Sequence, residues 1–227
     1  RQAAGDRRAD AGGTVLVRLD APRNPERGAN DTLGGTSELQ IALERDPSAR
    51  EARAVLESNL EEVERISRTV ENLFMLSRID NKAVDMEFEA VELRTLLEEI
   101  LHGCEVIAEQ KNVSLSLSAS EPFIVLGDAV LLMQLFLNLV ENAIKYNRKG
   151  GSVHVAISAD KSAVNVSVSD TGIGLRESEL ERIFERFYRV NKRMTREQGG
   201  AGLGLSLARW IAQIHGGIIT VESVYDS

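Results

Sequence analysis

Hydrophobic and polar residues alternate with a helical period in the first third of the chain. Between residues 48 and 80, apolar residues recur every three or four positions and charged residues fill the gaps. These apolar residues are Leu56, Leu60, Val63, Ile66, Val70, Leu73 and Phe74. The pattern predicts an amphipathic helix that follows Pro47 and begins with a capping box of Ser48 and Glu51. The preceding "SELQIALE" resembles the end of another helix, so an antiparallel helical hairpin is expected over residues 31–82.

The remainder, residues 83–227, mixes helical and strand periods. Expected helices cover 91–110, 129–147, 176–188 and 203–214, and expected strands cover 113–118, 123–128, 152–158, 163–170 and 217–223. Asp128 is placed to cap the second of these helices. Helices that cover one face of a sheet make an α/β sandwich, so the fold class expected for the whole chain is α+β, a helical hairpin followed by a sandwich domain.

Residues 1–30 are rich in Arg, Ala, Gly and Asp and show no sustained apolar period. Only "TVLVRLD", residues 14–20, is typical of a strand. This composition predicts a poorly packed or irregular arm.

Composition narrows the function. The chain has 227 residues and a net charge of −8, and this negative charge argues against general binding of nucleic acid. A single cysteine, Cys104, excludes an internal disulfide framework and is expected to be a buried or idle thiol. No run of about 18 apolar residues and no signal peptide is present, so a membrane anchor of a parent protein would lie outside this sequence.

Four polar residues share one face of the expected helix 129–147. Asn138, Asn142, Lys145 and Tyr146 lie at positions i, i+4, i+7 and i+8. A carboxamide suits a magnesium ion that carries phosphates, a lysine suits a phosphate, and a tyrosine ring can lie against a purine. In isolation, these residues also fit a solvated helix face.

The strand "VNVSVSD" favours a binding site over a solvated face. Alternation places Asp170 on the same buried side as the preceding valines. A carboxylate there is unfavourable unless a group donates to it, and the exocyclic amine of an adenine is a suitable donor. Gly172 and Gly174 follow directly and permit close approach of the backbone.

A second glycine-rich segment, "GGAGLGLSLA", enters the expected helix 203–214. Gly199, Gly200, Gly202 and Gly204 surround free N–H groups at the positive end of a helix dipole, a favourable place for phosphate. A hinge without a ligand is the alternative. Between the two glycine segments, a basic stretch with aromatic anchors is a candidate lid over a triphosphate.

Taken in order, "NLVENAIKY", "DTGIGL", "IFERFYR", "GAGLGL" and "HGG" resemble the catalytic domain of sensor histidine kinases of two-component systems. The resemblance covers about 48–223. It implies a Bergerat-type ATP-binding sandwich joined to a dimerising helical hairpin. The segment "LESNLEEVERISRTVENLFMLSRID" is similar to the second hairpin helix of the subgroup that senses heavy metals.

The resemblance also implies roles for single residues. Asn142 matches the magnesium ligand, with Asn138 in support, and Asp170 matches the carboxylate that reads adenine. The other implied ATP-binding positions are Lys145 and Arg189 at the phosphates, Tyr146 beside adenine, and the loop residues Gly172, Gly174, Gly200, Gly202, Leu203 and Gly204.

The same fold serves ATPases, in which a glutamate four residues before the magnesium asparagine activates water. Here that position is Asn138, and Glu141 lies about 100° round the helix. The resemblance therefore implies a protein-histidine kinase that uses ATP and Mg²⁺ and passes the γ-phosphate to a histidine and then to an aspartate of a response regulator. It implies a homodimer through the hairpin, no nucleic-acid partner, and the cytoplasmic portion of a parent in the bacterial plasma membrane.

The sequence departs from the family in two places. Counting back from the second hairpin helix puts the acceptor histidine between residues 24 and 30, where no histidine occurs. The three histidines present, His102, His154 and His215, are interpreted as structural. The chain also ends at "VESVYDS", before the family's final strand, so an unpaired sheet edge is expected.

The missing acceptor leaves several interpretations open. The chain could be a degenerate kinase, a sequence altered in handling, or a kinase that phosphorylates another chain. A catalytically incomplete nucleotide-binding scaffold and a plain ATP hydrolase are the rivals from other classes.

Overall fold

The computed structural model describes residues 12–19, 49–80, 86–119, 121–160, 163–190 and 201–225. The chain divides into two compact units. The first, here called the sheet unit, comprises Arg1–Asn24, Asp85–Glu185 and Gly204–Ser227. The second, the helix unit, comprises Pro25–Val84 and Arg186–Leu203.

The sheet unit contains a five-stranded sheet in the order β3-β5-β6-β1-β7. Its strands are β1 (Gly12–Leu19), β3 (Ser114–Ala119), β5 (Ser152–Ala159), β6 (Val164–Asp170) and β7 (Ile218–Val224). The β3–β5 pair is parallel and the other pairs are antiparallel. A separate antiparallel pair joins β2 (Glu89–Glu92) to β4 (Ile124–Gly127).

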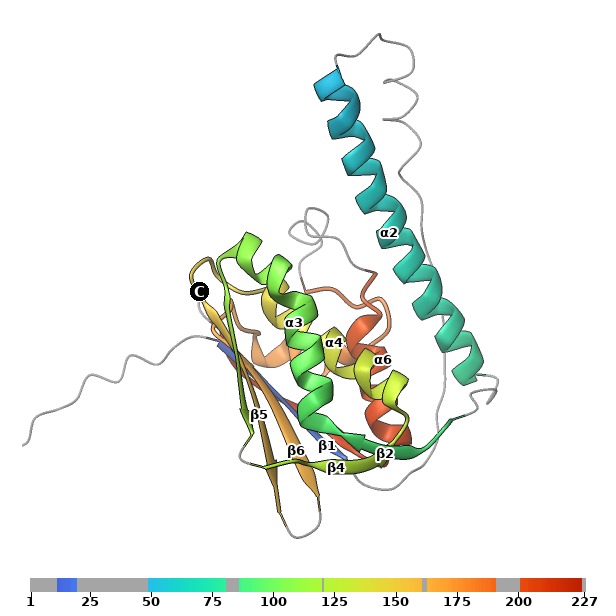
Figure 1. Cartoon of the computed structure of the whole chain (residues 1–227), viewed down its shortest axis with the longest axis vertical. Coiled ribbons are helices and arrows are strands. Elements are labelled where there is room, and N and C mark those ends of the chain that lie inside the picture. The colour runs from blue at the N-terminus through green and yellow to red at the C-terminus, as the bar shows by residue number, and fades with distance from the viewer. Residues whose placement is uncertain are drawn as a thin grey trace, which may run out of the picture. The chain divides into compact units, whose positions relative to one another are not determined.

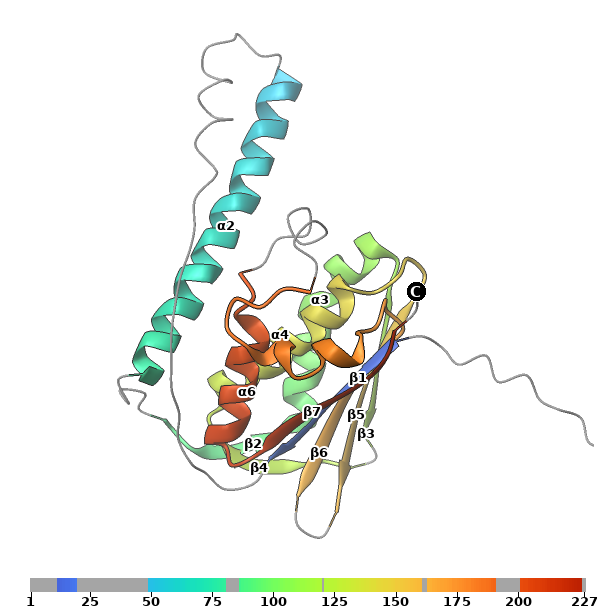
Figure 2. The same cartoon turned by 180° about the vertical axis from the view of Figure 1, so that it is seen from behind.

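Three helices cover one face of the large sheet (Figures 1 and 2). They are α3 (Leu93–Lys111), α4 (Ala129–Lys145) and α6 (Gly204–Ile214). Their apolar stripes meet the inward-facing residues of the strands, and buried side chains such as Phe136, Leu135 and Val166 have no exposed surface. This arrangement confirms the α/β sandwich. Among the described residues, no helix combines the length and apolar character needed to cross a membrane.

The strand β1 lies inside the sheet. It pairs with β6 on one side and β7 on the other, and Val17, opposite Val166 and Ile219, is fully buried. The expectation of a poorly packed arm is therefore wrong for Gly12–Leu19. The described sheet ends at β7, which pairs with β1 on one side and with no other described strand, in line with the expected unpaired edge. The other residues of the arm lie outside the described part of the chain.

The predicted helix 176–188 is a second correction. The chain instead forms two short 3₁₀ turns, Glu177–Glu179 and Arg182–Phe184. Their N–H groups bond three residues back, as Glu185 does to the Arg182 carbonyl at 2.9 Å, and Phe187 has a φ of +62°. A left-handed residue cannot continue a right-handed helix. The four-residue strand β2 was not predicted from the sequence.

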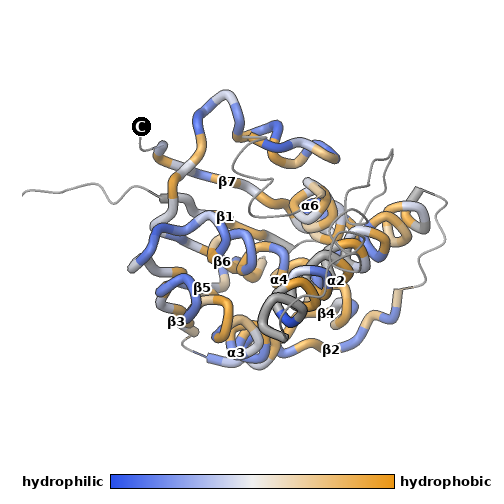
Figure 3. The backbone as a smooth tube through the Cα atoms, turned by 90° about the horizontal axis from the view of Figure 1, so that it is seen from above, coloured by the Kyte–Doolittle hydropathy of each residue, from blue (hydrophilic) through white to orange (hydrophobic). Residues whose placement is uncertain are grey.

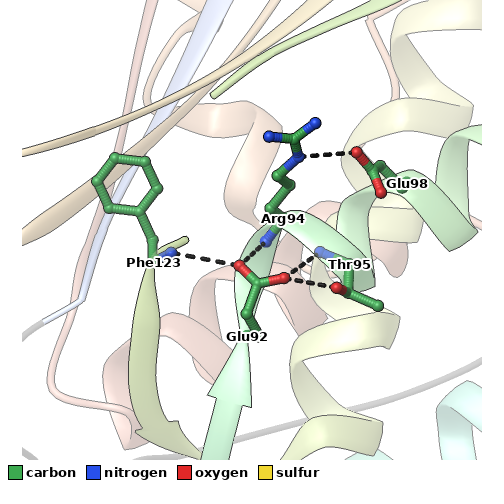
Figure 4. A network of polar contacts seen from close by, with 5 residues as sticks. All are labelled: Glu92, Arg94, Thr95, Glu98 and Phe123. Carbon is green, nitrogen blue, oxygen red and sulfur yellow. Dashed lines mark hydrogen bonds and ion pairs between the residues drawn. The ribbon is translucent and has the colours of Figure 1, made fainter. Parts of the chain in front are cut away.

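Glu92 joins β2, α3 and β4 at one point (Figure 4). Its carboxylate accepts from the N–H groups of Arg94 at 3.0 Å and Thr95 at 2.7 Å at the start of α3, and from Phe123 N–H at 3.2 Å just before β4. The Thr95 hydroxyl and these N–H groups lower the pKa of Glu92 to about 2. Glu92 is thus an N-cap that also fixes a neighbouring strand.

In the helix unit, α2 (Ala49–Asp80) confirms the predicted long helix. Hydrophobic and hydrophilic segments alternate along it in Figure 3. Leu76 and Ile79 near its end are buried, whereas most of the apolar seam is exposed. The first hairpin helix and Ser48 lie outside the described residues, so the hairpin and its capping box stay predictions.

Candidate nucleotide-binding site

The first part of the site is the polar face of α4. Asn138, Asn142, Lys145 and Tyr146 are all half-buried. The Asn138 amide donates to the Gln134 carbonyl at 2.8 Å, and a Cβ on Gly204 would lie 2.6 Å from the Asn138 carboxamide oxygen. A larger residue at Gly204 would displace the Asn138 side chain, and the structure therefore brings Gly204 and Asn138 together.

The C-terminal end of α4 meets the loop that follows β6. The Tyr146 carbonyl accepts from Ile173 N–H at 3.2 Å, and a Cβ on Gly172 would lie 2.6 Å from the same oxygen. The Lys145 ammonium lies 5.3 Å from the Tyr146 ring centroid, within cation–π range. Gly172 is required here because any side chain would push the loop away from α4.

Asp170 is the last residue of β6 and is half-buried. Desolvation raises the pKa of its carboxyl group, and hydrogen bonds from the N–H groups of Gly172 and Gly13 act in the opposite direction. The Gly172 bond measures 2.8 Å. The carboxylate predicted to need a donor thus has backbone donors, and they favour its ionised form.

Two polar residues that sequence analysis missed support this corner. The Thr171 hydroxyl donates to the Asn147 carboxamide oxygen at 3.2 Å and accepts from Ser152 N–H at 2.8 Å. The Asn147 amide donates to the Ser152 carbonyl at 2.9 Å. This network joins the end of α4 to the start of β5 and to Thr171, the neighbour of Asp170. The only signal in the sequence was that Asn147 and Thr171 directly follow the motif residues Tyr146 and Asp170.

Three further expected residues belong to the helix unit. Arg189 has a buried Nε atom without a hydrogen-bond partner among the described residues. Gly202 has a φ of +72°, and its carbonyl accepts from Phe187 N–H at 2.9 Å. Leu203 is buried. Gly199 and Gly200 lie outside the described residues, so their place at the phosphates stays a prediction.

The site offers magnesium few protein ligands. No group of three or more His, Cys, Asp or Glu side chains within the described ranges could hold a metal ion. The expected ligand, Asn142, supplies one half-buried carboxamide on the α4 face. This donor set fits Mg²⁺ that brings phosphate and water as its remaining ligands, as this ion commonly does.

The histidines serve the fold or the surface of the sheet unit. His215 is buried, accepts from Asp128 N–H through Nε2 at 3.0 Å, and bonds the Ile211 carbonyl through Nδ1 at 2.8 Å. His102 is paired with Glu105 on α3, and His154 lies 2.9 Å from the Ser116 hydroxyl. The contacts of His215 support its structural interpretation, whereas His102, with a side chain that is 83% exposed, lies on the surface.

Cys104 is buried in α3, and desolvation raises the pKa of its thiol to about 11. A thiol so seldom ionised is a poor nucleophile. The expectation of a buried thiol is confirmed.

Comparison with known proteins identifies the family. Residues 127–227 match the model of the histidine kinase-, DNA gyrase B- and HSP90-like ATPase family. The chain is 34% identical over 187 residues to the sensor protein IrlS of Burkholderia pseudomallei, a match that covers 82% of this chain and 40% of IrlS. The chain thus spans less than half the length of this curated relative.

Two solved structures share the fold. Full-length ShkA in complex with AMPPNP has a TM-score of 0.64 at 22% identity, over 85% of this chain and 43% of that one. The histidine kinase ThkA in complex with the response regulator protein TrrA has a TM-score of 0.61 at 20% identity, over 82% of this chain and 55% of that one. With the ordered motifs, the sandwich fold and the IrlS match, the chain belongs to the sensor histidine kinases.

Proposed function

We propose that this chain binds Mg-ATP between the polar face of α4 and the loop after β6. The observation that carries the proposal is the half-buried Asp170 carboxylate at the end of β6. Its neighbours Gly13 and Gly172 place no side chain against it. An ionised carboxylate held by backbone N–H groups is a suitable acceptor for the amine of adenine.

The residues of α4 continue this site toward the phosphates. Tyr146 lies next to the Gly172 loop and would contact the base, and Lys145, one residue earlier, would meet a phosphate. Asn142, about one turn before Lys145 on the helix, would hold magnesium with Asn138 in support. When bound, magnesium neutralises phosphate charge. Arg189, Gly200, Gly202 and Leu203 are proposed as further phosphate contacts on the strength of the family resemblance alone.

We further propose that the bound nucleotide donates its γ-phosphoryl group to a histidine. Asn138 supports transfer over hydrolysis because an amide cannot act as a general base for water. Such a reaction depends on positioning and charge neutralisation. The expected acceptor window holds no histidine, so the acceptor would be a histidine of another polypeptide.

A response regulator is the proposed recipient of the phosphoryl group, on an aspartate. The ThkA complex with the response regulator protein TrrA supports a partner of this kind. The ShkA complex with AMPPNP supports the nucleotide. A homodimer through the helical hairpin and a parent protein in the bacterial plasma membrane are proposed from the family alone.

The nucleotide site can be tested by calorimetry with ATP and magnesium. Asp170→Asn should weaken ATP binding at least about tenfold, because the amide that replaces one carboxylate oxygen repels the adenine amine. Asp160→Asn, a conservative change at a distant turn, is the matched control. Equal affinities of Asp170→Asn and the parent protein would show that the pocket is assigned wrongly.

Phosphoryl transfer can be tested with labelled ATP, with and without a histidine-bearing helical hairpin from a related kinase. Acid-labile label on the supplied hairpin supports an enzyme that acts on another chain. Tight ATP binding with no label on either chain supports the rival scaffold.

The hydrolase alternative predicts steady phosphate release that Asn138→Glu does not greatly increase. A kinase site instead releases little phosphate, and a glutamate at this position supplies the missing base. Phosphate release by the parent protein and by Asn138→Glu therefore separates these two functions.

A further inference from the structure

Asp170, Gly13 and Ser223 form a row across three adjacent strands. Gly13 of β1 pairs with Asp170 of β6 on one side and with Ser223 of β7 on the other. Paired residues of antiparallel strands project to the same face. A Cβ on Gly13 would lie 3.5 Å from an Asp170 carboxylate oxygen and 3.5 Å from the Ser223 hydroxyl oxygen. The middle position of the row therefore has no side chain.

The loop after Asp170 reaches from one end of this row to the other. It leaves β6 at Asp170, and Leu175 N–H donates to the Ser223 hydroxyl of β7 at 2.8 Å. Gly174, with a φ of +67°, lies so close to β7 that a Cβ would clash with the Val224 carbonyl. Because β1 lies between β6 and β7, residues 171–175 span the end of β1 beside Gly13.

Beyond Thr171 and Gly172, two contacts hold the far half of this loop. Ile173 N–H donates to Tyr146 at the end of α4, and Leu175 N–H donates to Ser223 at the end of β7. The first contact involves residues that the family resemblance already singled out. The second involves β7, the sheet neighbour of β1, and neither composition nor motif indicated any part in nucleotide binding for these two strands.

We propose that Ser223 and Gly13 are positioning residues that set the affinity and the base selectivity of the nucleotide site. Ser223 fixes the far end of the loop, and Gly13 leaves the space in which the loop and the Asp170 carboxylate keep their places. The inference rests on the proposed function, since it assigns a role toward adenine to the residues beside Asp170.

Selectivity distinguishes this role from simple stabilisation. Adenine presents an amine where guanine presents a carbonyl, so a well-placed Asp170 favours ATP over GTP. A displaced Asp170 loses the contact with ATP and changes GTP binding little. A residue that only stabilises the fold would lower the melting temperature and the folded fraction, but it would leave the ratio of the two dissociation constants unchanged.

The test measures the dissociation constants of ATP and GTP by calorimetry, with magnesium, on the full chain. Ser223→Ala should weaken ATP binding about fivefold to tenfold and lower the ATP preference by a similar factor, because one hydrogen bond to the loop is lost. Ser223→Thr keeps the hydroxyl and should restore both values. Melting temperatures without nucleotide show that each variant is folded.

Gly13 provides a second, independent pair. Gly13→Ala adds only a Cβ at ordinary contact distance and should weaken ATP binding far less than a larger side chain does. Gly13→Val adds two methyl groups beside the carboxylate and should weaken ATP binding more than tenfold. Thr14→Val is the matched control, since Thr14 bonds Ser169, the neighbour of Asp170, and lies on the opposite face of β1.

An unchanged ATP-to-GTP ratio in Ser223→Ala, or no recovery in Ser223→Thr, would overturn this inference while leaving the proposed function intact. If the parent protein does not bind ATP, or if Asp170→Asn binds it equally well, the proposed function itself fails. For Gly13, a folded Gly13→Val protein that binds ATP as tightly as the parent would overturn its part of the inference.

Discussion

The helices α4 and α2 have similar apolar seams but opposite environments. On α4, Leu135 and Phe136 have no exposed surface, whereas on α2 the side chains of Leu56 and Phe74 are 64% and 66% exposed. The sheet unit completes its own core because a sheet lies against the apolar face of α4. Within the described residues, the corresponding face of α2 has no such cover. An amphipathic pattern thus predicts a helix in both places, but it does not say whether the same chain buries the apolar face.

This difference has an energetic consequence. Burial of a leucine or phenylalanine side chain contributes roughly 2 kcal/mol, so the apolar seam of α2 represents a large unrealised stabilisation in a single chain. A second copy of the hairpin is the proposed cover. Four predictions test the contrast between a unit that is complete in one chain and a helix that needs another.

The largest effect is expected in the centre of the sheet. Val17→Asp places a charge without a partner between β6 and β7 and should lower the free energy of unfolding of the sheet unit by about 4 kcal/mol. Urea unfolding, monitored by circular dichroism, measures this loss of free energy. Leu16→Asp, one residue away and 37% exposed, should cost about 1 kcal/mol or less. Equal losses would mean that β1 is not an internal strand.

The next effect concerns α2. Leu60→Asp together with Phe74→Asp should weaken self-association by well over about hundredfold, because two apolar contacts are lost from each chain. The unfolding midpoint of the sheet unit should not change. Sedimentation equilibrium measures the association. Ser58→Asp lies on another side of the helix and is the control, and a parent protein that is monomeric at all concentrations would contradict the proposed dimer.

A smaller effect is expected at the start of α4. Asp128 accepts from Leu131 N–H at 3.0 Å, as the sequence predicted. Asp128→Ala should lower the free energy of unfolding by about 1 kcal/mol, and Asp128→Ser, which retains an acceptor, by a few tenths. Urea unfolding of both variants provides the measurement. Equal losses would show that the side chain does not cap the helix.

The smallest effect depends on pH. Burial lowers the pKa of His215, while the Ile211 carbonyl and the Asp128 carboxylate partly oppose the shift. The folded state favours the neutral ring, so this stabilisation is present above the unfolded pKa of about 6.5 and is lost as pH falls toward the lower folded-state pKa. Unfolding at pH 7.5 and 5.5 should show the loss in the parent and in His102→Gln, but less in His215→Gln. An equal loss in His215→Gln would contradict this assignment.

The strands β6 and β1 show which parts of the sheet could be predicted from the sequence. The valines of β6 alternate with polar residues for seven positions and are followed by a glycine turn, so its location and its buried face were both predictable. The alternation in β1 is interrupted by the apolar Leu16, an arm rich in glycine and charge precedes the strand, and its partners lie about 150 and 200 residues away in sequence. Local pattern carries no information about such distant pairing.

The candidate site shows the same limit. Asn138, Asn142, Lys145 and Tyr146 are related by helical spacing, and Asp170 by strand alternation, so their common orientation followed from short-range geometry. Gly13 and Ser223 have no local feature that connects them with Asp170. They became visible only when the register of three strands placed them in one row.

The sequence by itself determined α2, α3, α4 and α6, most strands, the family and the amide-bearing face of α4, because each depends on residues within a few turns or on an ordered set of motifs. Only the tertiary structure decided that β1 lies between β6 and β7 and that the loop after Asp170 is fixed on Ser223. Hydrogen bonds between these strands join residues that are far apart in the sequence and close only in the folded chain. No short stretch of sequence therefore shows which strands pair.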